Sequence, residues 1–492
     1  MKLRNLRMGS GAATNSMLLA FVQIITTMLG LIITKLLSVH FSLLEYGTYS
    51  QALLVTSTAT SISILGLTNA TNYFYNRTAD EGKQRTYIAT IFVLQYAVGL
   101  LCAIAIIAFR ELIADYFDNS NLTVIIPIIA FTPLLTNLIA MYQTLFVSIG
   151  KAKAISIRNL IVSLVRLLSV ILACFVFNKI VTVLIVILAL DVGQVVYFAV
   201  CYRASKFPIR IRDTRVPLLK EILAFSLPMA IYVMTNSLSR DMDKYVISTF
   251  ANTETLAIYT NAAKVLPFDF LTSSLITVLM PIIIRFINQG EYDETKKVFR
   301  LYLRIGYILT FVFVGGVVAL SKDWMLFLYD EKYLAGLSVF VIYLFVDMIR
   351  FANVTTVLSG AGKTKTLMVV SVIALACNAV FNMIGYQIAG MVGPALVTLL
   401  ITLLMTVTLL WLGAKEIKTR IFNLFDFKEM SLIVIEICVT GVAVNALSKF
   451  LEGLDFPFVV NLVGCYGLYL FVLLALNYKR VMECFRQLNC YK

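Results

Sequence analysis

Long apolar runs separated by short polar breaks follow one another along the whole chain. Each run is close to the roughly 20 residues that an α-helix needs to cross a bilayer, and together they predict fourteen membrane-spanning helices. The predicted spans are 16–38, 47–68, 86–109, 122–149, 155–177, 180–202, 222–249, 256–284, 301–320, 334–358, 366–388, 391–413, 430–448 and 457–477. The chain is therefore expected to be an all-α integral membrane protein.

The composition agrees with this prediction and excludes several other classes of protein. Hydrophobic residues make up 60% of the chain and charged residues 14%, whereas soluble domains have about 45–50% and about 25%. The single histidine, His40, excludes a multi-histidine metal site and most catalysis by a histidine base. The eight cysteines show no CxxC spacing and are expected to be small apolar residues. We expect neither a metal nor a cofactor.

Motifs typical of enzymes are missing from the sequence. Gly362-Lys363-Thr364 resembles the end of a phosphate-binding loop, but Val357 stands where such a loop requires its first glycine. There is also no nucleophile elbow and no paired-carboxylate motif. We therefore expect a protein that is not an enzyme.

The distribution of basic residues predicts the orientation of the chain. With a cytoplasmic N-terminus, the inner segments contain 28 Lys and Arg residues and the outer segments contain five. Cytoplasmic loops are rich in Lys and Arg, so fourteen spans with both termini in the cytoplasm are expected. The net charge of +14 is then mostly a topology signal, and nucleic acid is not an expected partner.

Two short motifs recur at nearly the same offset and indicate an internal duplication. GTYSQA at 47–52 and GKAK at 150–153 return about 210 residues later as AIYTNA and GKTK. An even number of spans per copy gives a parallel repeat, with substrate expected between the two lobes. The predicted parts are a six-helix lobe with a cytoplasmic linker at 1–215, a second six-helix lobe at 216–428, and two additional helices with a cytoplasmic tail at 429–492.

Ionisable residues inside the spans are the candidates for function. Each disfavours insertion by about 2.5–3.5 kcal/mol and normally faces a water-filled cavity or a partner. The basic ones are Lys35, Arg158, Arg166, Arg240, Lys244, Lys264, Arg304 and Arg350. The acidic ones are Asp191, Asp241, Asp243, Asp269 and Asp347. Eight bases against five acids predict a cationic interior.

Several of these residues also have structural interpretations. Lys35, Arg158 and Arg304 lie near predicted helix ends, where a long side chain can reach the membrane surface. Asp347 and Arg350 are three positions apart on one helix and can neutralise each other; Asp347 is otherwise a candidate for charge balance or ion coupling.

The charged cluster at 240–244 also has two interpretations. It lies near the outer face and contains Arg240 and Lys244 around two aspartates. A self-paired gate and an interfacial cap explain the cluster equally well. Its two basic residues stay on the list of candidate substrate contacts.

Arg166 and Lys264 are the strongest candidates for substrate binding. Arg166 lies near the middle of its span, with no acid within four positions. Lys264 precedes Pro267, where a proline break frees backbone groups that must face protein or a cavity. Asp191 and Asp269 are the acids best placed to balance these charges or to carry a coupling proton or cation.

The span count, the repeat, the EYGTY motif at 45–49 and the paired GKxK loops point to one family. Over residues 10–480 the chain resembles the polysaccharide transporter (Wzx-type) flippases of the multidrug/oligosaccharidyl-lipid/polysaccharide (MOP) superfamily. The resemblance implies two lobes in a V shape, as in MATE transporters, around a cationic cavity. In lipid II flippases of this superfamily, basic residues on spans 1 and 8 hold the diphosphate, and Lys35 and Lys264 are the basic residues on those spans here.

The implied function is transport across the bacterial inner membrane. An undecaprenyl-diphosphate-linked oligosaccharide would pass from the cytoplasmic to the outer leaflet by alternating access, for O-antigen, lipopolysaccharide, capsule or exopolysaccharide synthesis. Membrane lipids, a proton or sodium ion, and a polysaccharide polymerase with its chain-length regulator are further candidate partners. The alternatives are a multidrug or cation antiporter of the same superfamily, in which an acidic cavity is expected, and a membrane-embedded glycosyltransferase or ligase, in which a large outer loop is expected.

Overall fold

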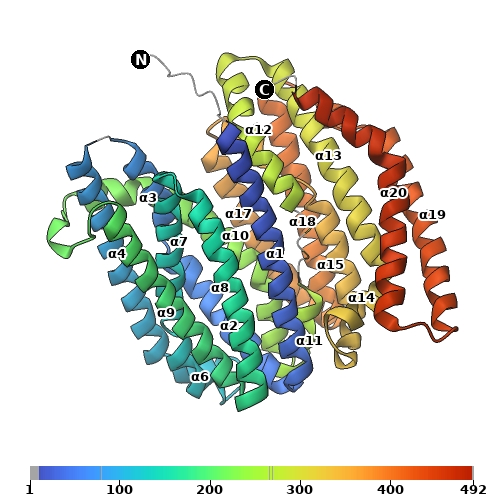
Figure 1. The fold of residues 1–492 in the computed structure, drawn as a ribbon, viewed down its shortest axis with the longest axis horizontal. Helices are drawn as coiled ribbons and strands as arrows, with labels where there is room; N and C mark the ends of the chain where they lie inside the picture. The colour runs from blue at the N-terminus through green and yellow to red at the C-terminus, as the bar shows by residue number, and fades with distance from the viewer. Residues whose placement is uncertain (1–9, 79, 265, 267, 269, 490–492) are drawn as a thin grey trace. The chain divides into compact units, whose positions relative to one another are not determined.

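A computed structural model describes residues 10–78, 80–264, 266, 268 and 270–489 of the chain. Every regular element in these residues is a helix (Figure 1). Thirteen candidate spans among them are long and apolar enough to cross a membrane, judged by length and composition. The prediction of an all-α, multi-pass membrane protein is confirmed.

The helices group into two compact units, residues 1–257 and 258–492. The first unit contains α1 (Ser10–His40), α2 (Leu43–Ser63), α3 (Leu67–Asn76), α4 (Glu81–Ala108), α5 (Arg110–Tyr116), α6 (Leu122–Ile129), α7 (Thr132–Ser148), α8 (Ala152–Leu172), η1 (Ala173–Phe177), α9 (Ile180–Ser205), η2 (Ile211–Asp213) and α10 (Leu218–Phe250). Within this unit α10 packs on α2, α3 and α4. The lobe boundaries at 215 and 428 were predicted from the sequence repeat, and they stay a prediction.

The second unit begins within α11 (Thr253–Ala262). It continues with α12 (Phe270–Gln289), α13 (Tyr292–Ala319), α14 (Ser321–Leu328), η4 (Glu331–Gly336), α15 (Leu337–Ile349), α16 (Thr356–Gly360), α17 (Thr364–Ala389), α18 (Val392–Glu416), η5 (Ile421–Leu424), α19 (Phe427–Glu452) and α20 (Phe458–Asn489). The last two helices correspond to predicted spans 13 and 14, and both pack against α13.

The predicted eighth span, 256–284, is not a continuous helix. The helix α11 ends at Ala262, and α12 begins at Phe270. Residues 265, 267 and 269 lie outside the described residues, and with them Pro267 and Asp269. The prediction was wrong about the length of the helix, although Pro267 had indicated a break within this run.

The EYGTY motif has a local structural role at the start of α2. The Ser42 hydroxyl accepts a hydrogen bond from the Glu45 amide, and the Glu45 carboxylate accepts one from the Ser42 amide at 3.0 Å. This reciprocal cap satisfies two amides that a helix start leaves without intrahelical partners. A Cβ at Gly47 would overlap the carbonyl of Thr253, so glycine lets α2 approach the first residue of α11 closely.

Aromatic packing fixes α7 against α9 in the first unit. The Tyr142 ring from α7 stacks on Phe198 from α9 at 5.8 Å between centroids, and Phe146 meets the same ring edge-on at 5.2 Å. All three side chains belong to the buried core of this unit. Such packing holds α9 in one position, and α9 carries the charged residues described next.

Candidate functional site

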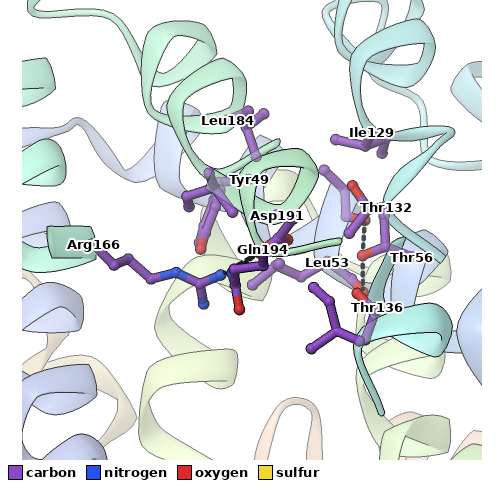
Figure 2. A pocket seen from close by; sticks show the side chains of 13 residues that line it. Tyr49, Leu53, Thr56, Ile129, Thr132, Thr136, Arg166, Leu184, Asp191 and Gln194 are labelled. Carbon is purple, nitrogen blue, oxygen red and sulfur yellow. Dashed lines mark hydrogen bonds and ion pairs between the residues drawn. The ribbon is translucent and has the colours of Figure 1, made fainter. Parts of the chain in front are cut away.

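A pocket of about 330 Å³ lies inside the first unit. Figure 2 shows Arg166 reaching from α8 towards Asp191 and Gln194 of α9, with a group of threonines farther away. The lining residues come from α2, α6, α7, α8 and α9: Tyr49, Ala52, Leu53, Thr56, Ile129, Thr132, Thr136, Ile139, Arg166, Leu184, Ile187, Asp191 and Gln194. Five helices thus enclose a space with both polar and apolar walls.

Arg166 and Asp191 form an ion pair at the pocket wall. Arg166 Nη2 donates a hydrogen bond to Asp191 Oδ1 at 2.8 Å, and Gln194 Nε2 donates to the same oxygen at 2.8 Å. The Asp191 side chain is only 7% exposed, whereas the Arg166 side chain is 36% exposed. Both residues were candidates in the sequence analysis, and the structure brings them together from α8 and α9. The guanidinium is therefore the accessible half of the pair.

A second arginine extends this network behind the pocket. Arg158 Nη2 donates to Gln194 Oε1, and Arg158 Nη1 donates to Asn159 Oδ1 at 2.9 Å. The Arg158 guanidinium also lies over the Phe198 ring, 4.4 Å from its centroid. At 8% exposure, Arg158 is buried among the helices of the first unit. The network consequently contains two guanidinium groups and one carboxylate.

Hydroxyl groups make up most of the remaining polar lining. Thr56 of α2 faces the pocket together with Thr132 and Thr136 of α7, and Tyr49 adds a phenol. The Thr56 hydroxyl donates to the carbonyl of Ala52 at 3.1 Å, as hydroxyls in helices often do. The sequence analysis did not predict these residues, or Gln194. The available signal was spacing, because Gln194 follows Asp191 by three positions and shares its helix face.

Lys264 lies in the second unit, just after the end of α11. Nearby, the Leu266 amide donates to Asp347 Oδ2 of α15 at 3.0 Å. Asp347 is buried, and this bond satisfies a backbone group that the end of the helix has freed. Arg350 directly follows α15 and is half-buried. The carboxylate of Asp347 therefore supports the backbone next to Lys264.

Lys35 lies on α1, the helix that packs against α8. Its side chain is half-buried. Because α8 carries Arg166, Lys35 lies on a helix that neighbours one of the pocket helices. It is not among the residues that line the pocket.

The charged cluster at 240–244 is partly self-paired. Lys244 Nζ donates to Asp241 Oδ1 at 2.8 Å, and the Ser57 hydroxyl of α2 donates to Asp241 Oδ2 at 3.0 Å. Arg240 is exposed. The cluster thus links α10 to α2 through Asp241.

Arg304 forms a two-point ion pair. Its Nε and Nη2 donate to the two oxygens of Glu429 from α19 at 2.9 and 2.5 Å. The helix α13 begins at Tyr292, so Arg304 lies three turns inside it. The sequence did not predict this partner, because Glu429 is distant from Arg304 in sequence; the interpretation of Arg304 as a side chain that extends to the membrane surface stays a prediction.

Comparison with known proteins identifies the family. The model of the family described as polysaccharide biosynthesis protein matches residues 12–287, which is more than half of the chain. The teichuronic acid biosynthesis protein TuaB of Bacillus subtilis (strain 168) is 20% identical over 273 residues, which cover 55% of this chain. The match spans 56% of the length of TuaB.

Two solved structures show the same fold. Lipid II flippase MurJ in its inward closed conformation has a TM-score of 0.71 and 14% identity, with 95% of this chain and 100% of MurJ covered. An inward-facing multidrug resistance MATE transporter has a TM-score of 0.67 and 12% identity, with coverage of 81% and 98%. These folds are those of membrane transporters and not of enzymes. The chain therefore belongs to the polysaccharide biosynthesis protein family and has the fold of MOP-superfamily transporters.

Proposed function

We propose that the protein is a flippase for a lipid-linked oligosaccharide in the synthesis of a cell-surface polysaccharide. It would move an undecaprenyl-diphosphate-linked repeat unit from the cytoplasmic to the outer leaflet of the bacterial inner membrane by alternating access. The observation that carries the proposal is Arg166, a guanidinium that lines a pocket within membrane-spanning helices. Membership of the polysaccharide biosynthesis protein family supplies the class of substrate.

The chemistry of the pocket supports an anionic, sugar-bearing substrate. A guanidinium in a medium of low dielectric constant attracts an anion much more strongly than it does in water. Three threonine hydroxyls and the Tyr49 phenol can form hydrogen bonds with sugar hydroxyls. A pocket for cationic drugs would instead be expected to present an accessible carboxylate, but the carboxylate here is buried under Arg166 and Gln194.

The other candidate residues take different parts in this proposal. Lys264 and Lys35 would contact the diphosphate, by resemblance to the lipid II flippases. Asp191, Asp347 and Asp269 are the candidates for charge balance or for carrying a coupling ion. Arg304 and Lys244 hold ion pairs with Glu429 and Asp241 and would have structural roles.

The proposed orientation rests on basic loops that meet at one end of the first unit. Arg77 pairs with Glu221, Lys206 with Glu81 at 3.2 Å, and Arg85 with Asp213 at 3.7 Å. These pairs join the loop after α3 and the linker before α10 to the starts of α4 and α10. A basic end of this kind is expected on the cytoplasmic side.

The test is the fate of the lipid-linked repeat unit in a strain that lacks this gene. Mass spectrometry of polyprenyl-linked intermediates should detect accumulated repeat units. A membrane-impermeant glycan label should fail to reach them, because they remain in the cytoplasmic leaflet. An unchanged lipid pool together with altered drug sensitivity would refute the flippase and favour the antiporter.

A further inference from the structure

We infer that the pocket of the first unit binds a sugar that carries a single carboxylate, a uronic acid, within the oligosaccharide. The inference rests on the proposed function and narrows its substrate class. It assigns Arg166 to the sugar part of the headgroup and leaves the diphosphate to other residues.

The charge network around the pocket contains one more positive than negative group. Arg166 and Arg158 share a single carboxylate, Asp191, through direct and Gln194-mediated hydrogen bonds. Among the described residues that line the pocket, Asp191 is the one acid. An uncompensated charge inside a membrane-embedded lobe is strongly unfavourable. A bound anion of charge minus one would neutralise the network.

This charge count separates the two anionic parts of the proposed substrate. A diphosphate bridge carries two negative charges, so in this pocket it would leave one negative charge without a partner. A uronic acid carboxylate carries one and balances the excess. The carboxylate also matches the planar fork of a guanidinium, which binds carboxylates through two parallel hydrogen bonds.

The geometry leaves Arg166 able to bind such a group. Its bond to Asp191 uses one donor of Nη2, and a guanidinium has further N–H donors. The Arg166 side chain keeps 36% of its surface accessible, whereas the Asp191 side chain is 7% exposed. Asp191, which is itself held by Gln194, therefore orients Arg166, and the ligand would meet the guanidinium from the pocket side.

The size and lining of the pocket fit a sugar ring. A volume of about 330 Å³ lies at the lower end of the usual range for small-molecule sites, so the pocket can take one or two sugar rings and not a long repeat unit. Thr56, Thr132 and Thr136 offer hydroxyl partners on the wall away from Arg166, and Tyr49 offers a ring face and a phenol. Sugars present hydroxyls and apolar C–H faces, which suit such partners.

The first experiment measures binding of two matched sugars to the full chain in lipid nanodiscs. Methyl glucuronide and methyl glucoside differ only in a carboxylate in place of a hydroxymethyl group, and saturation-transfer NMR can follow both. We expect the glucuronide to bind about tenfold more tightly. Arg166→Gln should abolish this preference, and Arg166→Lys should keep part of it because the charge remains without the fork. The exposed Arg110→Gln is the control and should keep the full preference.

Equal binding of the two sugars to the unaltered protein would overturn the inference, as would an undiminished preference in Arg166→Gln. A second measurement does not depend on the stability of any variant. The repeat unit that accumulates in the deletion strain should contain a hexuronic acid by mass spectrometry, and a neutral repeat unit would also overturn the inference.

The inference and the proposed function can fail separately. Accumulation of a lipid-linked repeat unit without glucuronide binding would keep the flippase and reject the acidic-sugar pocket. Glucuronide binding that depends on Arg166, without any trapped intermediate, would keep the pocket and reject the flippase.

Discussion

Two of the arginine–carboxylate pairs within the candidate spans, Arg304–Glu429 and Arg166–Asp191, differ in how much of the arginine stays accessible. Arg304 meets both oxygens of Glu429, and the two side chains are 20% and 12% exposed. Arg166 meets one oxygen of Asp191 and keeps 36% of its side-chain surface accessible beside a pocket. An arginine and a carboxylate thus form a two-point, mostly buried ion pair in one unit. In the other unit they form a one-point pair whose guanidinium can still bind an anion.

Breaking the two-point pair should have the largest effect. Glu429→Ala leaves the Arg304 guanidinium without its partner among packed helices, so we expect a loss of about 3–5 kcal/mol in the free energy of unfolding. Thermal unfolding of the detergent-solubilised protein measures it. The double variant Arg304→Met with Glu429→Leu should recover most of the loss, because it removes both charges and retains apolar packing. A single variant as stable as the unaltered protein would contradict the comparison.

Removing the arginine of the one-point pair should abolish activity and spare the fold. Arg166→Ala deletes the accessible guanidinium, and the pocket can admit water in its place, so we expect complementation of the deletion strain to be lost while the protein stays in the membrane. The matched control is Lys322→Ala, an exposed position on α14, which should be fully active. Normal complementation by Arg166→Ala would show that Arg166 is not required for substrate binding.

Neutralising Asp191 should strengthen the binding of an anionic sugar in the pocket. Asp191→Asn keeps an oxygen that can accept from Arg166 and raises the positive charge of the network by one, so we expect methyl glucuronide to bind several-fold more tightly. Saturation-transfer NMR measures the change. Weaker binding would mean that Asp191 contributes to binding chiefly through the position of Arg166.

The smallest effect on transport is expected from the amide between the two arginines. Gln194→Leu removes one hydrogen bond to Asp191 and one from Arg158, and hydrogen bonds to charged groups are worth about 1.5–3 kcal/mol each. We expect a loss of thermal stability and a reduced preference for glucuronide, with transport retained. Complete loss of transport would show that Gln194 contacts the substrate directly.

Most of the fold could be predicted from the sequence because span length and apolar runs are local properties. Arg166 and Asp191 could also be identified as candidates, since charges inside apolar runs are easy to find in a sequence. The partner of Arg304 could not be predicted, because Glu429 is far from it in sequence and hydropathy carries no information on which helices touch. The interruption after Ala262 agrees with the break that Pro267 indicated, but the apolar run gave no sign of how many residues the interruption takes.

The hydrogen bond between the Leu266 amide and Asp347 has a consequence for how this protein can vary. Lys264 lies two residues before Leu266, so the segment that carries it is anchored by a helix that follows much later in the sequence. A substitution at position 347 that keeps an acceptor oxygen, such as asparagine, should be tolerated, whereas an apolar residue should displace the segment. Among homologues, position 347 is therefore expected to change in concert with the segment around Lys264.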